Sequence, residues 1–232
     1  MPYKNINIEN IGTVKIYKRR GVRSIRLSIV GDGSVRVTQP KWLPYKAGIE
    51  FAQSRKQWIS KNQKPREELI NNQRVGKSYK LAFGRGQGLT APKTRVQNGY
   101  VTVTLPPRMY PGDHLSQQAA TKAVERALKK DAEKLLVPRA KLLATRHGFQ
   151  FKSVRVKKLK SRWGSCSQNK DIVLSSYLIQ LPWHLIDYVI LHELQHTTML
   201  AHGKDFWLSL ERHVEGLADI RKDMKKFQAR VI

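Results

Sequence analysis

The residues with the clearest potential for chemistry lie between positions 191 and 207. His192, Glu193 and His196 form the pattern H-E-x-x-H. Positions four apart on an α-helix lie nearly in line, so two histidines at this spacing point from one face and can bind a single Zn²⁺. Glu193 projects beside them and can take a proton from an activated water without being a ligand itself. The pattern predicts a zinc site at His192 and His196, with Glu193 as the catalytic general base.

A zinc ion in a hydrolase usually has three protein ligands and one position left for water. His202 is the leading third ligand, six residues after His196. On an unbroken helix this spacing is about 600° and places the imidazole on the wrong side, so we expect the chain to turn between residues 197 and 203. Glu211 and Glu215 remain competing ligands, because another arrangement of zinc sites takes a carboxylate from a following helix.

The sequence before this pattern indicates a buried helix. Apolar residues recur there at helical spacing, at Leu185, Ile186, Val189 and Ile190. Burying two imidazoles and a carboxylate within one turn is unfavourable unless something compensates, and a bound metal is the simplest compensation. Pro182 suits the start of this helix.

The second half of the chain has the order of elements expected of a zincin-like core. A helix is expected over residues 115–137, after which Pro138 should kink or restart it and Gly148 should end it. Strands are expected over residues 154–159 and 172–181, ahead of the zinc-binding helix. In such a core an edge strand can hold an extended substrate by backbone pairing.

The loop between these two strands contains the candidate substrate-binding residues. Arg162 could polarise a carbonyl or bind an anionic group, and Trp163 could wall the cleft. The alternative is that this loop only closes the domain. A further donor would stabilise the negatively charged intermediate, and the candidates for it are Arg162, Tyr177 and His184.

The first half of the chain is predicted to form a sheet. Apolar residues alternate with polar ones over residues 25–29 and 35–37, on either side of Gly31-Asp32-Gly33, which is typical of a hairpin. A helix is expected over residues 45–62, with further strands at 79–83 and 100–105.

Prolines between positions 106 and 111 mark the expected domain boundary. We therefore predict an α+β protein with a β-rich, basic amino-terminal domain containing one helix over residues 1–112. A zincin-like metallohydrolase domain is expected over residues 113–232.

Two stretches resemble the YgjP-like metallopeptidase family, also called the domain-of-unknown-function 45 family, which is related more distantly to the SprT-type zinc proteases. They are H-E-L-Q-H-T-T-M-L-A-H-G-K-D-F-W at 192–207 and S-R-W-G-S-C-S at 161–167. The amino-terminal half of the same family is echoed by R-S-I-R-L-S-I at 23–29, G-S-V-R-V at 33–37 and F-A-Q-S-R-K-Q-W-I at 51–59. The resemblance covers nearly the whole chain.

The resemblance implies one zinc ion at His192, His196 and His202, with Glu193 as general base. Gln195 stands where the family usually has a small residue, and we expect its side chain to point away from the metal. The resemblance does not imply a physiological substrate.

Composition restricts the class of protein. Within the 232 residues there is one cysteine, Cys166, so no internal disulfide forms, which favours a reducing cytoplasm. No amino-terminal signal or apolar run long enough to span a membrane is seen. The net charge of +27, from 44 basic and 17 acidic residues, would attract nucleic acid, an anionic membrane or an acidic substrate. A dispersed, solvated basic surface is the alternative interpretation.

Three functions fit these residues. A zinc metallopeptidase acting on a peptide or protein is the leading one. A metal-dependent phosphohydrolase of an anionic small molecule such as a nucleotide, of the nucleoside triphosphate pyrophosphatase type, would use the same activated water. A nucleic-acid-binding protein with a structural zinc fits less well, because structural sites usually fill all four positions, often with cysteine. The sequence does not indicate an oligomeric state.

Overall fold

The computed structural model of the chain describes residues 3–9, 11–30, 34–62 and 68–231. The chain divides into two compact units, residues 1–67 and residues 68–232. The boundary predicted between residues 112 and 113 falls inside the second unit. The reason is that strands before residue 112 share an apolar core with the long helix after it.

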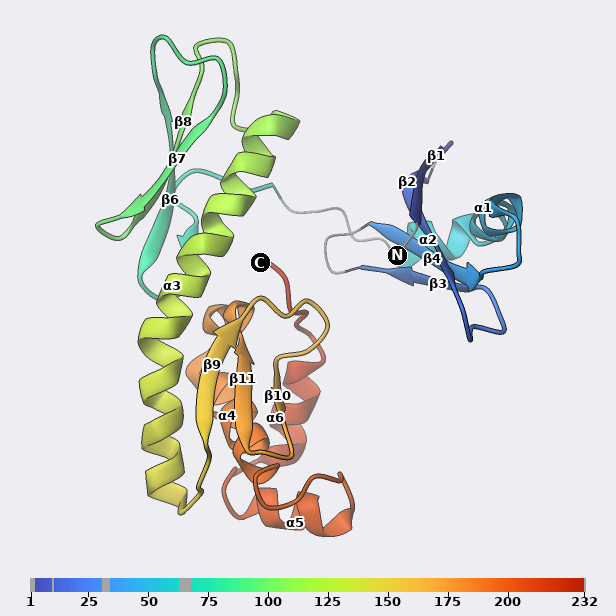
Figure 1. The fold of residues 1–232 in the computed structure, drawn as a ribbon. Helices are drawn as coiled ribbons and strands as arrows, with labels where there is room; N and C mark the ends of the chain where they lie inside the picture. Colours follow the sequence, from blue (N-terminus) through green and yellow to red (C-terminus); the bar gives the residue numbers. More distant parts are fainter. Residues whose placement is uncertain (1–2, 10, 31–33, 63–67, 232) are drawn as a thin grey trace. The chain divides into compact units, whose positions relative to one another are not determined.

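The first unit is a four-stranded sheet accompanied by two helices (Figure 1). Its strands are β1 (Tyr3–Ile8), β2 (Gly12–Arg19), β3 (Arg26–Ile29) and β4 (Val35–Pro40), in the spatial order β1-β2-β4-β3. β3 and β4 pair antiparallel, which confirms the predicted hairpin, although its Gly31-Asp32-Gly33 turn lies outside the described residues. β2 and β4 pair in parallel.

The single helix expected over residues 45–62 is two helices, α1 (Tyr45–Ser54) and α2 (Lys56–Asn62). The break lies at Arg55, where φ is −103° and ψ is 16°, outside the helical range. Ala52 of α1 and Ile59 of α2 are both buried in the unit's apolar core. The break therefore lets each segment present its own apolar side to that core.

The second unit begins with a sheet that packs on one long helix. The sheet contains β5 (Arg74–Val75), β6 (Tyr79–Arg85), β7 (Lys93–Gln97) and β8 (Tyr100–Leu105), in the order β5-β6-β8-β7. The helix is α3 (His114–His147), whose buried face is lined with alanine and leucine. Asp131 of α3 is buried and accepts hydrogen bonds from the backbone of Lys77 and from the backbone and hydroxyl of Ser78. It fixes the turn before β6 onto the helix.

α3 continues through Pro138, so of the two expected effects of this proline, a kink or a restart, the helix does not restart there. Pro138 and Lys134, whose backbone carbonyl loses its partner, are both exposed, so water can satisfy that carbonyl. Leu136 and Ala140 on either side are fully buried and keep the helix packed. The helix ends as predicted at Gly148, which adopts a left-handed φ of 73°.

A three-stranded sheet lies against the carboxyl-terminal part of α3 (Figure 1). It contains β9 (Ser153–Lys157), β10 (Gly164–Cys166) and β11 (Asp171–Ser175), in the order β10-β11-β9, with β9 and β11 parallel. The strand expected over residues 172–181 is shorter, because the Ser175 side chain accepts a hydrogen bond from the Tyr177 amide and starts the 3₁₀ turn η1 (Ser176–Gln180).

Three helices complete the second unit: α4 (Trp183–Gln195), α5 (Lys204–Glu211) and α6 (Leu217–Met224). Pro182 precedes α4, as predicted. The sequence of helix, sheet and H-E-x-x-H helix expected of a zincin-like core is thus present, and the protein is α+β. Across the part of the chain that the structure describes, no helix combines the length and apolar character needed to cross a membrane.

Candidate metal centre

The last turn of α4 presents the H-E-x-x-H residues. Leu185, Ile186, Val189 and Ile190 are buried in the core and fix the rotation of the helix. His192 and Glu193 lie in the final turn and His196 caps the helix. The apolar pattern upstream therefore determines the face on which the two histidines lie.

The chain turns after α4, as expected, and brings a third histidine to the first two. Backbone hydrogen bonds from Thr197 to Leu194 and from Met199 to Gln195 close the helix end. α5 begins only after Gly203, and the connecting segment places the Nε2 atom of His202 3.0 Å from that of His192.

One ring nitrogen from each of His192, His196 and His202 lies within 4.8 Å of the other two. Among the residues that the structure describes, this is the group of potential ligands that comes together, and it includes neither Glu211 nor Glu215. The two glutamates are exposed on and after α5.

Aromatic rings hold the three imidazoles in place. Phe206 of α5 is buried, and its ring centroid lies 5.1 Å from that of His192 and 4.8 Å from those of His196 and His202. Trp207 stacks on His202 with centroids 5.6 Å apart. The F-W pair after the third histidine thus forms one wall of the cluster.

The nitrogen atoms of the cluster suit a divalent metal. The Nδ1 atom of His196 donates to the carbonyl oxygen of Met199 at 3.0 Å, which leaves the Nε2 lone pair of His196 available. Burial lowers the pKa of His192 to about 3, with smaller contributions from His196 and His202, and burial also lowers the pKa of His202. Neutral imidazoles that converge in this way are the donors that zinc and related ions prefer.

Glu193 is buried, with 6% of its surface exposed. Burial raises the pKa of its carboxyl group to about 7, while the positive charge of Arg162 acts in the opposite direction. A carboxylate with this pKa can accept a proton and return it near neutral pH, which is the property of a general acid–base group.

Gly164 on β10 makes room for the Glu193 carboxylate. A Cβ atom at Gly164 would lie 2.6 Å from both Cγ and Oε1 of Glu193, well inside van der Waals contact. The Glu193 side chain therefore occupies the space that a Cβ atom at position 164 would take, and any other residue there requires this side chain to move.

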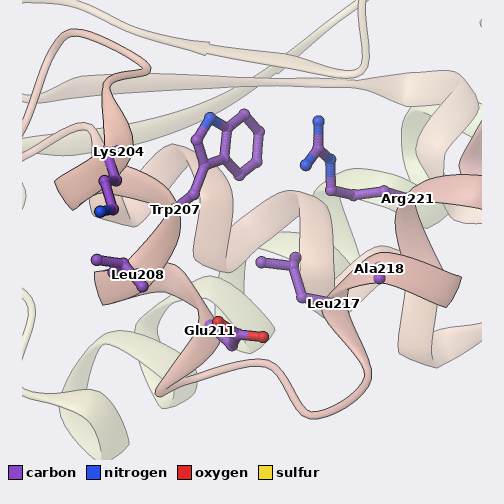
Figure 2. Close-up of a pocket in the computed structure, with 7 residues that line it drawn as sticks. All are labelled: Lys204, Trp207, Leu208, Glu211, Leu217, Ala218 and Arg221. Atoms are coloured by element: carbon purple, nitrogen blue, oxygen red, sulfur yellow. The ribbon is translucent and has the colours of Figure 1, made fainter.

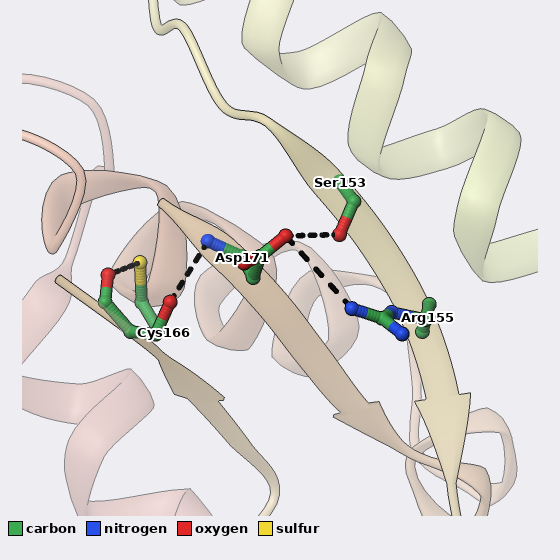
Figure 3. A network of polar contacts seen from close by, with 5 residues as sticks. Ser153, Arg155, Cys166 and Asp171 are labelled. Carbon is green, nitrogen blue, oxygen red and sulfur yellow. Dashed lines mark hydrogen bonds and ion pairs between the residues drawn. The ribbon is translucent and has the colours of Figure 1, made fainter. Parts of the chain in front are cut away.

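Polar contacts between the strands hold β10 in position (Figure 3). Asp171 of β11 accepts a hydrogen bond from the hydroxyl of Ser153 and lies 3.9 Å from the guanidinium of Arg155, both on β9. Its backbone amide donates to the Ser167 hydroxyl at 3.2 Å, and the Ser167 amide donates to its carbonyl at 3.0 Å. These bonds fix the turn that aligns β10 beside β11.

Comparison with known proteins places this geometry in a family. The model of the YgjP-like metallopeptidase domain matches residues 23–227. The chain belongs to the YgjP-like metallopeptidase family. The crystal structure of the metallopeptidase zymogen of Pyrococcus abyssi abylysin shares 25% identity over 43% of this chain and 98% of that chain, with a TM-score of 0.34. No curated protein matches the chain significantly.

Membership of the YgjP-like family identifies the chain as a metal-dependent hydrolase and implies a divalent metal. The three histidines of the predicted motif are brought together in this YgjP-like chain, and Glu193, which follows His192, is buried. Gln195 is buried, and its side chain hydrogen-bonds to the hydroxyls of Thr198 and Ser209.

The remaining predicted site residues have different surroundings. Arg162 is exposed and close enough to influence the charge of Glu193, and Trp163 is half-buried against the core. Tyr177 is buried and donates its hydroxyl to Glu125 at 2.7 Å, while His184 is exposed.

Cys166 of β10 is half-buried, and burial together with the charge of Glu193 raises its pKa to about 11. The sulfur is therefore a neutral thiol at physiological pH, as expected for a packing residue and not for a nucleophile.

Tyr188 lies beside the histidine group and was not predicted from the sequence. Its ring centroid lies 6.0 Å from that of His192, one helical turn earlier on the same face of α4. Burial raises the pKa of its hydroxyl, which therefore remains a hydrogen-bond donor. The four-residue spacing of Tyr188, His192 and His196 in the sequence could have revealed it.

Trp207, which stacks on His202, also lines a small pocket of about 280 Å³ in this YgjP-like chain (Figure 2). Trp207, Glu211 and Arg221 line it, together with Lys204, Leu208, Leu217 and Ala218. The guanidinium of Arg221 lies 3.9 Å from the centroid of the Trp207 ring. Arg221 therefore restrains the ring that stacks on His202, and the sequence offered no signal for this contact.

Proposed function

We propose that this protein is a zinc-dependent peptidase in which His192, His196 and His202 hold the metal and Glu193 is the general base. The observation that carries the proposal is the convergence of three imidazoles at the end of the helix that also carries the buried Glu193. A catalytic site needs an open coordination position, and three histidine ligands leave one. When bound there, zinc would supply an activated water and polarise the substrate carbonyl.

The chain's own residues would move the proton and support the developing charge. The Glu193 carboxylate takes a proton from the water that attacks the carbonyl carbon and delivers this proton to the leaving amine. Its raised pKa supports both steps. Tyr188 keeps its hydroxyl proton, since burial raises its pKa, and is our candidate donor to the oxygen that becomes negative.

A peptide substrate is favoured by the strand beside the site. β10 pairs with β11 along one edge, and no strand in the described part of the chain pairs with its other edge. A Cβ atom at Gly164 of this strand would meet the Glu193 side chain, so the strand runs close to that carboxylate. An extended peptide that adds to the open edge by backbone hydrogen bonds would pass the catalytic carboxylate.

Zinc-loaded protein incubated with an unfolded polypeptide, and separately with nucleoside triphosphates, tests the proposal. We expect cleavage of the polypeptide, detected by mass spectrometry. Glu193→Gln should retain zinc and reduce turnover by about 10²- to 10⁴-fold, the usual contribution of a general base. Glu211→Gln removes an exposed carboxylate outside the histidine group and is the matched control. Hydrolysis of the triphosphates without peptide cleavage, or full activity of Glu193→Gln, would contradict the proposal.

A further inference from the structure

The first unit carries a pocket of about 580 Å³ that the proposed peptidase reaction does not use. Its lining is four basic side chains, one tryptophan and two small or apolar residues: Arg19, Arg20, Arg23, Lys41, Trp42, Gly21 and Val22. No acidic side chain lines it. Each of the four basic residues is exposed.

The parallel pairing of β2 and β4 creates this pocket. Arg19 at the end of β2 lies opposite Pro40 at the end of β4. The amide of Lys41 donates to the carbonyl oxygen of Arg19 at 3.0 Å. The segment that follows β2 and the turn that follows β4 therefore meet at the carboxyl ends of these two inner strands. Basic residues distant in sequence are gathered there by the fold.

The positive charge of this unit is largely uncompensated. Residues 1–67 include 15 basic and 4 acidic residues, a net charge of +11. Within the described part of the unit, the ion pair found joins Lys46 to Glu50 at 4.0 Å, away from the pocket lining. Among the described residues, no acidic side chain pairs with the cations around the pocket, and like charges held this close favour a polyanionic partner.

Trp42 adds a flat aromatic surface to the cations. It is 77% exposed, the highest value among the large apolar residues exposed in the described chain. The cation–π contacts seen in this unit involve Tyr17, Tyr45 and Phe51, and none involves Trp42. Both the ring and the neighbouring guanidinium groups are therefore available to a ligand.

We propose that this surface, the Trp42 surface (residues 19–23, 41 and 42), binds single-stranded nucleic acid. The four basic side chains contact successive phosphates and a base stacks on Trp42. A single strand fits better than a duplex, because only unpaired bases offer a face to an aromatic ring. The inference does not depend on the peptidase proposal, since it uses no residue of the metal centre.

Fluorescence anisotropy of the full chain with labelled single-stranded oligonucleotides tests the proposal. Binding should weaken steeply between 50 and 200 mM salt, with single strands bound more tightly than the matching duplex. Trp42→Ala should weaken binding by about tenfold or more, as expected for loss of one stacked base. Trp58→Ala, which removes another exposed tryptophan of the same unit, is the matched control and should have little effect.

A charge variant provides an independent readout. Arg19→Gln/Arg20→Gln/Arg23→Gln should reduce the slope of log affinity against log salt by about 2, since each lost phosphate contact contributes about 0.7. Arg55→Gln/Lys56→Gln/Lys61→Gln removes the same charge at and after the end of α1 and should leave most of the slope. All these positions are exposed, and circular dichroism confirms folding of each variant. Absence of binding at 50 mM salt or tighter binding of duplex would overturn the proposal. Equal losses of affinity in Trp42→Ala and Trp58→Ala, or equal reductions of the salt slope in the two triple variants, would also overturn it.

Discussion

The close approach of Gly164 to Glu193 provides a test of how the proposed catalytic carboxylate is positioned. In Gly164→Ala the new methyl group would lie 2.6 Å from Cγ and Oε1 and 2.8 Å from Cδ of Glu193. Ordinary contacts begin near 3.4 Å, so the carboxylate must move by about 0.8 Å. Gly164 does not have a left-handed φ, so alanine is otherwise compatible with this strand position.

A displacement of about 1 Å at a reacting group typically reduces turnover by about 10²-fold. We therefore expect kcat of Gly164→Ala to fall by roughly 10²-fold, equivalent to about 2.7 kcal/mol in activation free energy. KM and zinc content should change little, because neither the histidines nor the backbone edge of β10 is altered. Steady-state peptide hydrolysis, with metal analysis of the same samples, measures both quantities.

Two further variants separate positioning from general destabilisation. Gly84→Ala places a methyl group where nothing lies within 4 Å, in the strand β6, and should retain full activity. Glu193→Asp withdraws the carboxylate by one methylene, so adding it to Gly164→Ala should restore part of the lost kcat. Wild-type kcat in Gly164→Ala, or a loss explained entirely by unfolding or loss of metal, would refute the reasoning.

Three other predictions follow from the same structure. Arg162→Gln should move the acid limb of the kcat/KM profile to higher pH. Burial raises the pKa of Glu193 to about 7 and the Arg162 charge opposes this rise, so removing the charge raises the pKa further. The reaction needs the unprotonated carboxylate, and activity is therefore lost at a higher pH. A limb that stays in place or moves to lower pH contradicts this. Asp131→Ala should lower the free energy of unfolding by about 3 kcal/mol in urea titration, because three donors lose a buried acceptor; a loss below about 1 kcal/mol would show that the turn does not depend on it. His202→Ala should weaken zinc binding more than about a hundredfold in competition with a chelator, which exceeds the effect of losing a residue that only hydrogen-bonds to a ligand. Glu211→Gln should leave zinc binding nearly unchanged. The reverse order would make Glu211 the ligand.

The clustering of the three histidines was largely predictable because the information for it is local. The four-residue spacing of His192 and His196 fixes their common face once a helix forms. The position of His202 required only that the helix end before it, and the structure ends α4 at Gln195. Tyr188 follows the same helical spacing and was also accessible to this reasoning.

The features that the sequence did not reveal depend on packing between distant segments. Gly164 matters because β10 lies against α4, and a glycine in a loop-like stretch gives no sign of such a contact. The prolines at 106–111 mark a break in local structure and predict a boundary at 112, whereas the two compact units meet near residue 67. The burial of Val101, Val103 and Leu105 against α3 keeps that segment in the second unit.

X-ray absorption spectroscopy of untagged, zinc-supplied protein, combined with metal analysis, tests the central claim most directly. We expect one zinc ion per chain surrounded by nitrogen and oxygen atoms, with the signature of imidazole rings, and the loss of that signature in His192→Ala. A sulfur neighbour from Cys166, or less than stoichiometric metal after zinc is supplied, would contradict the assignment of His192, His196 and His202 as the metal site.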